Sequence, residues 1–328
     1  MRQLTGYAMS AIVVAAVVFA FAPRHPAPLA VTQIHADRVQ VNALLSTGDR
    51  LIAVGERGTI LSSHDSGRSW EASQVGEGRD ATLTGVVALS PQVLVAVGHD
   101  GWILRSTDSG MSWREMHHDP SLGEPLLGVW SGDGHQVVAY GSYGKFLVSS
   151  DAGEHWSARE MPGDGAHFNS LDGGADGRQM LVGEQGLVLR SSDGGEHWQD
   201  LPPFYNGSLF GVVRLSASHW LAYGMRGHVF TSADFGDTWQ RIEIDSSQPI
   251  YGHARLPGQA GLVLVGADSR LIRLDAEGNL LGIEQRRGLG TLTSAVVLNA
   301  HHLLVAGERG VFQGADHTVA AAALEHRP

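Results

Sequence analysis

SHDSGRSW, at Ser63–Trp70, is the first of five copies of one phrase in this sequence. The others are STDSGMSW at Ser106–Trp113, SSDAGEHW at Ser149–Trp156, SSDGGEHW at Ser191–Trp198 and SADFGDTW at Ser232–Trp239. Their aspartates follow one another at intervals of 41 to 43 residues. A fixed period of about 40–50 residues with short apolar runs between the copies is typical of a β-propeller, in which each repeat folds into one four-stranded blade. The sequence therefore predicts an all-β propeller.

A second pattern, two glycines that bracket two residues, extends the repeat to seven copies. It occurs at Gly55–Gly58, Gly98–Gly101, Gly141–Gly144, Gly183–Gly186, Gly224–Gly227 and Gly307–Gly310, with an altered copy at Gly266–Ser269. Each copy lies between two β-branched runs, so it is predicted to be a hairpin turn whose glycines supply a positive φ. Apolar runs at 83–89, 126–130, 209–213, 250–253 and 292–297 fill the inner-strand position, and we expect these strands to be buried on both faces.

Seven repeats of about 42 residues account for the chain from residue 31 to about residue 320, which predicts a single seven-bladed β-propeller over 31–320 and a C-terminal tail at 321–328. The last repeat lacks the phrase after Gly310, so its blade has no fourth strand of its own. The segment Val31–Gln40 is available to supply that strand. We therefore expect the ring to be closed by the N-terminal strand, which would remove an open sheet edge.

Residues 1–30 are predicted to be an export signal. Arg2 precedes fifteen apolar or small residues at 8–22, and the helix-breaking sequence PRHPAP follows them. Two alternatives stay open: a signal peptide cleaved after Ala22 or Ala30, and an uncleaved N-terminal membrane anchor. Both place the propeller in the periplasm or at the outer face of the cytoplasmic membrane. The absence of cysteine agrees with a large exported core that needs no disulfides.

The repeated phrase has a structural explanation. Its Asp can accept backbone N–H groups two residues on, its Gly can take a positive φ, and its Trp can bury its ring between blades. Five equivalent turns around a ring do not form one active site, so a catalytic role for these carboxylates is disfavoured. We interpret the following residues as structural: Asp65, Gly67, Trp70, Asp108, Gly110, Trp113, Asp151, Gly153, Trp156, Asp193, Gly195, Trp198, Asp234, Gly236 and Trp239.

The phrase resembles the Asp box of the BNR-repeat proteins, which include sialidases. The stretches AVGERGTILSSHDSGRSW at 53–70 and VGHDGWILRSTDSGMSW at 97–113 resemble the photosystem II stability and assembly factor family of seven-bladed propellers. The resemblance covers about residues 31–315 and departs at Leu274–Leu281, which keeps only Gly278 of the box. It implies a non-catalytic, photosystem II assembly factor-like protein that holds a membrane-protein segment. In a host without photosynthesis it implies an accessory factor for an envelope complex such as a transporter.

The hairpin tips and the connections between blades are expected to share one face of the propeller, with the boxes on the other. Partner binding is expected on the tips, because their mixture of Arg, Tyr, Met and carboxylates is typical of a protein-binding surface. The alternative for each tip residue is simple solvation of a turn. The predicted partner-binding residues are Glu56, Arg57, His99, Asp100, Ser142, Tyr143, Glu184, Gln185, Met225, Arg226, Asp268, Glu308 and Arg309.

Composition limits the remaining functions. A net charge of −11 disfavours nucleic acid and anionic lipid as partners. We expect no cofactor and no metal, since His117 and His118 read as solvent-facing loop residues, and we expect a monomer. The alternative function is a sialidase-like glycoside hydrolase or a glycan-binding propeller. The hydrolase would need three arginines and a Tyr–Glu pair, for which Arg57, Arg226, Arg309, Tyr143 and Glu184 are the candidates, but the Arg-Ile-Pro motif that sialidases carry is absent.

Overall fold

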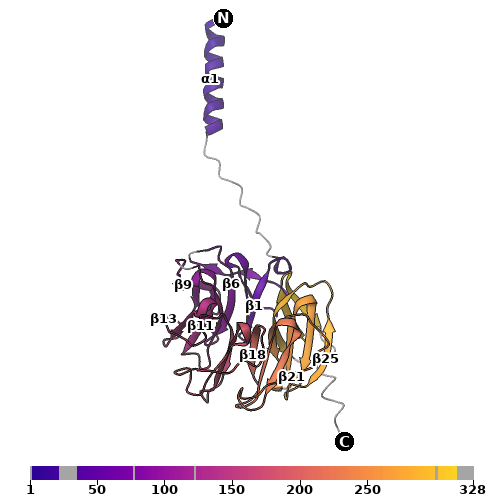
Figure 1. Ribbon diagram of the computed structural model, residues 1–328. Coiled ribbons are helices and arrows are strands. Elements are labelled where there is room, and N and C mark those ends of the chain that lie inside the picture. Colours follow the sequence, from indigo (N-terminus) through magenta and orange to yellow (C-terminus); the bar gives the residue numbers. More distant parts are fainter. Residues whose placement is uncertain are drawn as a thin grey trace. The chain divides into compact units, whose positions relative to one another are not determined.

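The structure, a computed structural model, describes residues 2–21, 35–76, 78–121, 123–259, 261–299 and 302–315. It divides into two units, Met1–Ile34 and His35–Pro328. In the first unit, α1 (Arg2–Phe21) is a single helix that includes most of the apolar run (Figure 1). Among the described residues, none of the helices combines the length and the apolar character that crossing a membrane requires. The expected cleavage positions, Ala22 and Ala30, lie outside the described residues.

The described residues of the second unit form seven sheets, one for each repeat, and one of these sheets gains a strand from the end of the preceding repeat. Blades 1 to 3 consist of β1 (Val41–Ser46), β2 (Leu51–Gly55), β3 (Ile60–Ser63) and β4 (Glu71–Ala72); β6 (Leu83–Ala88), β7 (Leu94–Gly98), β8 (Ile103–Ser106) and β9 (Ser112–His117); and β10 (Leu126–Trp130), β11 (Val137–Gly141), β12 (Phe146–Ser149) and β13 (Ser157–Ala158). Blade 2 gains β5 (Gln74–Val75), which pairs with β9 in parallel. All other pairings are antiparallel between neighbours in sequence, as a propeller blade requires.

Blades 4 to 7 continue the same order. They consist of β14 (Phe168–Gly173), β15 (Gln179–Gly183), β16 (Val188–Ser191) and β17 (Gln199–Asp200); β18 (Leu209–Arg214), β19 (Trp220–Gly224), β20 (Val229–Ser232) and β21 (Gln240–Ile242); β22 (Ile250–Arg255), β23 (Leu262–Gly266), β24 (Arg270–Leu274) and β25 (Leu280–Gln285); and β26 (Leu292–Asn299), β27 (His302–Gly307) and β28 (Gly310–Ala315). Short 3-10 turns are η1 (Ala36–Arg38), η2 (Glu56–Gly58), η3 (His99–Gly101), η4 (Ser142–Gly144), η5 (Glu184–Gly186), η6 (Met225–Gly227), η7 (Pro257–Gln259) and η8 (Ala267–Ser269).

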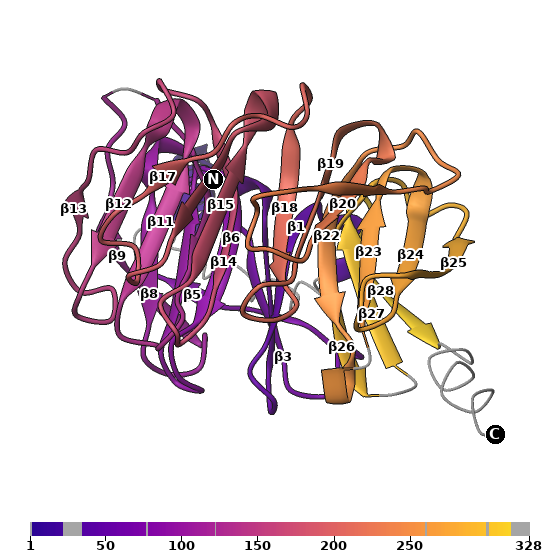
Figure 2. The same cartoon turned by 60° about the horizontal axis from the view of Figure 1, so that its bottom comes forward.

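The seven sheets form a closed ring. The first strand of each sheet contacts the first strand of the next, through β1, β6, β10, β14, β18, β22 and β26 and back to β1. Figure 2 shows the inner strands β1, β18 and β22 near the middle, with the outer strand β13 toward one side and the outer strand β25 toward the other. The predicted seven-bladed β-propeller is therefore confirmed.

The core lies mainly around the second strands. All five residues of β2, β7, β11, β15, β19 and β23 are buried, whereas each inner strand contains half-buried or exposed residues besides its buried ones. The expectation that inner strands are buried on both faces is therefore wrong. The second strand lies within the sheet and is covered by neighbouring blades on both faces, while the first strand borders the axis of the ring.

Each inner strand carries a β-bulge at its second residue, where the pairing with the second strand of the blade shifts. The bulged residues, which we call the inner ring, are Asn42, Thr84, Leu127, Asn169, Phe210, Tyr251 and Thr293. A small residue follows each of them: Ala43, Gly85, Gly128, Ser170, Gly211, Gly252 and Ser294. At Gly85 and Gly252 the small residue allows adjacent inner strands to approach closely, whereas at Gly128 and Gly211 it makes room for the side chains of Tyr140 and Tyr223 in the second strand of the same blade. A Cβ at Gly252, for example, would lie 2.2 Å from the carbonyl oxygen of Thr293.

The N-terminal strand closes the ring, as predicted, because β1 lies beside β26. The Thr293 hydroxyl donates to the carbonyl oxygen of Val41 (2.8 Å), and the Leu44 N–H donates to the Ser294 hydroxyl (3.0 Å). These two bonds join the first and last blades across about 250 residues of sequence.

The expectation that Val31–Gln40 forms the fourth strand of blade 7 needs correction. In the described part, from residue 35, the chain forms η1 and contacts β28 rather than extending along it. A Cβ at Gly310 would lie 2.1 Å from the carbonyl oxygen of Ala36. In blade 1 the corresponding glycine, Gly58, donates to Ala81 in the connection to the next blade. Ala36 thus occupies the place of such a connection, and residues 31–34 lie outside the described residues.

Candidate functional site

The Asp box of blade 1 shows how each repeated phrase closes its turn. The Ser63 hydroxyl, which is 1% exposed, donates to the Asp65 carboxylate (2.8 Å) and accepts the N–H of Gly67 (2.9 Å). The same carboxylate accepts the N–H groups of Arg68 (3.0 Å) and Ser69 (2.9 Å). Equivalent bonds recur in the boxes of blades 2 to 5. The box Asp thus holds backbone groups three and four residues on, not two as expected.

Acid is expected to weaken these turns. In blade 5, hydrogen bonds from the hydroxyl and then the backbone N–H of Thr238 lower the pKa of Asp234 to about 2. A carboxyl whose pKa is lowered by folding stabilises the protein above its unfolded pKa of about 4, and this contribution is lost as the pH falls through the folded pKa. Asp234→Asn should therefore lower the melting temperature at pH 7 and reduce its decline between about pH 4 and pH 2, as measured by circular dichroism. An unchanged decline would contradict this role.

The box tryptophans differ in burial. Trp113 is 3% exposed, and its indole N–H donates to the carbonyl of Gly110 (3.0 Å). The other four are only half-buried: Trp70, Trp156, Trp198 and Trp239. Burial between blades, expected of all five, is therefore nearly complete only at Trp113. The reason is β5, which pairs with β9 and brings Val75 against the same hydrophobic cluster.

The first glycine of each hairpin tip is required for close approach rather than for its φ. At Gly55, φ is −166°, which any residue adopts, but a Cβ there would lie 2.0 Å from the carbonyl oxygen of Gln40. The first glycines of the other tips meet the residue before their own inner strand in the same way. Positive φ values of 54–59° occur instead at the second bracketed residue, namely Arg57, Asp100, Tyr143, Gln185, Arg226 and Asp268. The expectation that both glycines supply positive φ was therefore only partly right.

The tips and the connections between blades lie on one face, which we call the tip face. The N–H of Gly58 donates to Ala81 (2.8 Å), and that of Gly144 donates to Ala166 (2.9 Å), in each case to the connection leading to the next blade. The boxes follow the far ends of the third strands and thus lie on the opposite face. The loops that the sequence assigned to partner binding are therefore held together by backbone hydrogen bonds.

Most of the predicted binding residues are accessible on the tip face. The exposed ones are Glu56, Arg57, His99, Tyr143, Gln185, Arg226, Asp268, Glu308 and Arg309. Asp100, Glu184 and Met225 are half-buried, and Ser142 is buried. The predicted set thus lies on one face, although each tip belongs to a different blade.

Some tip side chains are used by the fold itself. The Glu308 carboxylate accepts the N–H of Thr291 (3.1 Å). The Arg309 guanidinium donates to the carbonyl of Gly288 (2.9 Å). Each of these bonds ties a tip to the connection between blades 6 and 7, which sequence reasoning could not reveal.

Other tip side chains have no such partner. Within the described part of the chain, Arg57 and Arg226 form no side-chain hydrogen bond and no ion pair. Tyr143 is 65% exposed, and the edge of its ring meets the ring of His167 at a centroid distance of 4.7 Å. Glu56, His99 and Gln185 are also exposed and form no side-chain hydrogen bond or ion pair in the described part of the chain, so these six side chains are available to a partner.

Sequence reasoning missed the inner ring, which lies at the tip-face end of the inner strands. In four blades its polar side chain donates to the first carbonyl of the next inner strand, from Asn42 to Leu83, Thr84 to Leu126, Asn169 to Leu209 and Thr293 to Val41. The remaining members are Leu127, Phe210 and Tyr251. The rings of Phe210 and Tyr251 stack at 5.3 Å, and Tyr251 is 38% exposed. The sequence did carry one sign of this apolar area: Leu127, Phe210 and Tyr251 occupy a repeat position that is polar in the other four blades.

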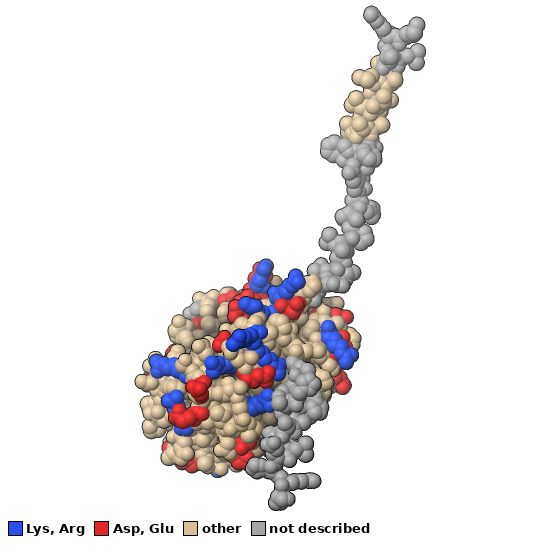
Figure 3. Space-filling view, turned by 90° about the vertical axis from the view of Figure 1, so that its right-hand side faces the viewer, with Lys and Arg blue, Asp and Glu red and all other residues tan. Residues whose placement is uncertain are grey.

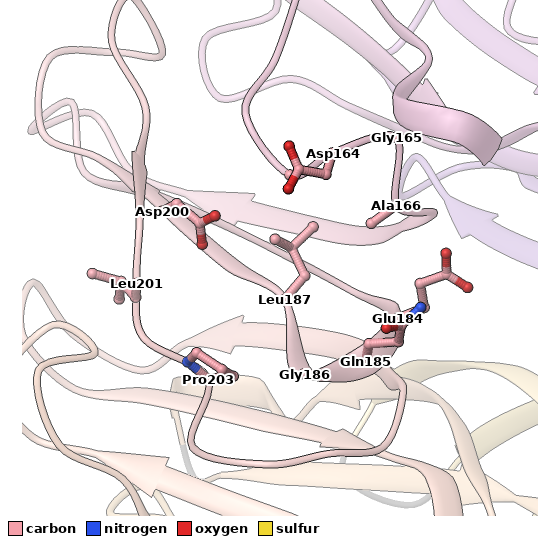
Figure 4. A pocket seen from close by; sticks show the side chains of 11 residues that line it. Asp164, Gly165, Ala166, Glu184, Gln185, Gly186, Leu187, Asp200, Leu201 and Pro203 are labelled. Atoms are coloured by element: carbon pink, nitrogen blue, oxygen red, sulfur yellow. The ribbon is translucent and has the colours of Figure 1, made fainter.

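A shallow cavity of about 310 Å³ lies beside the tip of blade 4 (Figure 4). Figure 4 shows Asp164, Asp200 and Leu187 around it. Burial, and then the charge of Asp164, raise the pKa of Asp200. The lining residues are Gly163, Asp164, Gly165, Ala166, Glu184, Gln185, Gly186, Leu187, Asp200, Leu201 and Pro203. This acidic cavity opens on the tip face, because Gln185 both lines the cavity and belongs to the tip of blade 4.

The sialidase-like alternative finds little support in this geometry. Its three candidate arginines lie on the tips of three different blades, and Arg309 is bound to a backbone carbonyl. Tyr143 contacts the ring of His167, while the Glu184 carboxylate accepts the N–H of the same His167 (3.1 Å). The Tyr–Glu pair that the hydrolase would need is therefore replaced by separate contacts to one histidine.

The comparisons with known proteins agree with the expected family. Residues 28–178 match the family model described as "Photosynthesis system II assembly factor YCF48". The resemblance to the photosystem II assembly factor family is thus confirmed over the first half of the propeller. No curated protein matches the chain in sequence.

Several solved structures share the fold. "YCF48 bound to D1 peptide" is 18% identical with a TM-score of 0.66, and the match covers 88% of this chain and 97% of that one. "YCF48 from Cyanidioschyzon merolae" is 14% identical with a TM-score of 0.66, covering 87% and 97%. The WD40 propeller domain of Doa1 is equally similar, with 14% identity, a TM-score of 0.68 and coverage of 88% and 97%. At these identities the structures show the fold alone.

Proposed function

Starting from the match of residues 28–178 to the photosystem II assembly factor family, we propose that this chain is a non-catalytic propeller that binds a protein partner. In this proposal, residues 1–30 direct its export to the periplasm or to the outer face of the cytoplasmic membrane. The partner is a segment of a membrane protein, and the propeller is an accessory factor in the assembly of a membrane or envelope complex. The solved relative bound to a D1 peptide supports this class of partner, because it shares the fold.

One observation carries the proposal: the tip face presents large side chains that the fold does not use. Arg57 and Arg226 are exposed and form no ion pair among the described residues. A guanidinium can give a partner carboxylate two parallel hydrogen bonds. The stacked rings of Phe210 and Tyr251 add an apolar area at the same end of the inner strands. Arginine and aromatic residues are the types that carry most binding energy in protein interfaces.

The double variant Arg57→Glu with Arg226→Glu is expected to weaken capture of the membrane partner at least tenfold, which corresponds to about 1.4 kcal/mol. The melting temperature should stay nearly unchanged, because neither guanidinium holds another part of the fold. Capture of proteins from detergent-solubilised host membranes, quantified by mass spectrometry, measures the effect.

A matched control is Arg68→Glu with Arg114→Glu, which changes the net charge equally at two exposed sites outside the tip face. In the described part of the chain, the Arg114 guanidinium pairs with Glu154 (3.1 Å), and such an exposed pair is worth about 0–1 kcal/mol. If control and tip variant lose capture alike, net charge and not the tip face determines binding. Full capture by the tip variant would move the binding site elsewhere.

Turnover of a fluorogenic sialoside distinguishes a sialidase-like hydrolase from the proposed non-catalytic binding protein. The proposal expects none above background for the wild-type protein. Turnover that Arg309→Ala abolishes would replace the binding role by a catalytic one.

A further inference from the structure

The acidic cavity beside the tip of blade 4 continues into a second hollow of about 410 Å³, which is lined by Gln185, Pro203, Phe204, Tyr205 and Asn206. Gln185 and Pro203 line both hollows, so together they form one groove, which we call the blade-4 groove. Its aromatic side chains are held by the fold. Phe204 stacks on Trp239 at a centroid distance of 4.8 Å, and the Tyr205 hydroxyl donates to the carbonyl of Met225 (3.3 Å). The groove thus joins an acidic end to an aromatic end.

Blade 2 shows what fills the place of the acidic cavity elsewhere in this protein. The Arg79 guanidinium, from the connection between blades 1 and 2, gives the Glu115 carboxylate two hydrogen bonds (2.7 and 3.0 Å). The indole N–H of Trp102 donates to the same carboxylate (2.8 Å). The hydrogen bond from Arg79 is the main reason that the pKa of Glu115 is lowered. A guanidinium and a carboxylate therefore neutralise each other at this position of blade 2.

Blade 4 carries two carboxylates at the positions of this ion pair. Asp200 is equivalent to Glu115, because each lies two residues after the box Trp and pairs with a leucine of the third strand. Asp164 is equivalent to Arg79, because each lies two residues before the alanine that accepts the N–H of a tip glycine (2.8 and 2.9 Å). The guanidinium of blade 2 is thus replaced by a carboxylate in blade 4.

The same comparison explains why the cavity is open. Leu187 follows the second tip glycine of blade 4 as Trp102 does in blade 2, and its smaller side chain leaves space. Figure 4 shows Asp164 and Asp200 near Leu187. Neither carboxylate has a side-chain hydrogen bond or an ion pair among the described residues. The pKa of Asp200 is accordingly raised, first by burial and then by the charge of Asp164, opposite to that of Glu115.

The charges that line the blade-4 groove are all negative. They belong to Asp164, Glu184 and Asp200, and none of the described lining residues is Lys or Arg. The Glu184 carboxylate lies 3.9 Å from the ring of His167, and Arg226, on the next tip, lines neither hollow. Elsewhere the charges are mixed. Figure 3, which looks onto the side that carries β25 in Figure 1, shows Lys and Arg side chains interspersed with Asp and Glu.

We propose that the blade-4 groove binds an arginine side chain of the partner's membrane-protein segment, an inference that rests on the proposed function. The guanidinium takes the place that Arg79 has in blade 2 and binds Asp164 and Asp200. Its planar donors suit two carboxylates, and neighbouring apolar residues of the segment cover Phe204 and Tyr205. The segment thus carries both signs of charge, because the tip arginines bind its carboxylates.

The test uses the full chain and two fluorescein-labelled peptides, followed by fluorescence anisotropy. One peptide has a single arginine between two leucines and is otherwise built of glycine and serine. The other has citrulline, which keeps the shape of arginine without its charge. The arginine peptide is expected to bind at least tenfold more tightly than the citrulline peptide, because only its guanidinium neutralises the acidic cavity.

Asp164→Asn with Asp200→Asn should weaken binding of the arginine peptide at least tenfold and remove the preference over citrulline. The fold should be retained, because neither carboxylate holds another described part of the chain. The matched control is Asp49→Asn with Glu71→Gln, which removes the same charge at two exposed residues of blade 1. The control should bind as the wild type does.

Asp164→Arg restores the residue that blade 2 has at this position. The new guanidinium is expected to pair with Asp200, so the melting temperature should rise while binding of the arginine peptide falls at least tenfold. Wild-type affinity in this variant would overturn the proposal. Equal binding of the two peptides by the wild type, or unchanged affinity in the double asparagine variant, would also overturn it. Displacement of the peptide by calcium at constant ionic strength would assign the two carboxylates to a metal ion instead.

Capture of proteins from detergent-solubilised host membranes separates this inference from the proposed function. Asp164→Asn with Asp200→Asn should lower capture at least fivefold relative to the blade 1 control. If that variant captures fully while Arg57→Glu with Arg226→Glu does not, the proposed function stands and the arginine site is overturned. If the wild type selects the arginine peptide but captures no membrane protein, the proposed function fails while the guanidinium site stands.

Discussion

Trp113→Ala is expected to lower the free energy of unfolding by about 3–5 kcal/mol. The ring is 3% exposed and belongs to the cluster that joins blades 1 and 2 through Ile52 and Leu94. Removing it loses the transfer free energy of a large apolar side chain and leaves a cavity that packed strands cannot fill. The indole hydrogen bond to Gly110 is lost as well. Denaturant unfolding followed by circular dichroism measures the change.

Trp156→Ala is the matched control, because Trp156 occupies the same box position in blade 3. Its ring is half-buried and has no added strand beside it. Its loss should therefore cost less, about 1–2 kcal/mol. Equal losses for the two variants would show that the added strand β5 does not determine burial at this position.

Much of the fold could be predicted from the sequence, since a propeller repeats its local signals. The box aspartates and the glycine pairs recur with a common period, and each marks a turn whose chemistry is local. Features that depend on contacts between repeats could not be predicted. The pairing of Gln74 with Ser112 across 38 residues, which creates β5, has no local signature. The η1 turn at the ring closure likewise depends on how the chain passes Gly310.

The candidate site was predictable to a similar degree. The tip residues could be found because each follows a glycine at a fixed place in its repeat. The sequence could not predict which tip side chains bond to the rest of the fold. The bond from Arg309 to Gly288, for example, depends on the path of the connection between blades 6 and 7. Phe210 and Tyr251 were missed because the signal they leave, an aromatic residue at a position that is polar in four other blades, does not by itself reveal the bulge, which depends on how the inner strand pairs with the second strand.

The small residues behind the inner ring can be tested at Gly252. A Cβ there would lie 2.2 Å from the carbonyl oxygen of Thr293, so Gly252→Ala must separate β22 from β26 and is expected to cost about 1–3 kcal/mol or more. Gly282→Ala is the matched control in the same blade, because a Cβ there meets nothing within 4 Å. It should be neutral or slightly stabilising, since alanine reduces the freedom of the unfolded chain. Thermal unfolding of both variants measures the difference. If Gly252→Ala melts like Gly282→Ala, β22 and β26 can accommodate a methyl group between them, and close approach does not explain the glycine at this position.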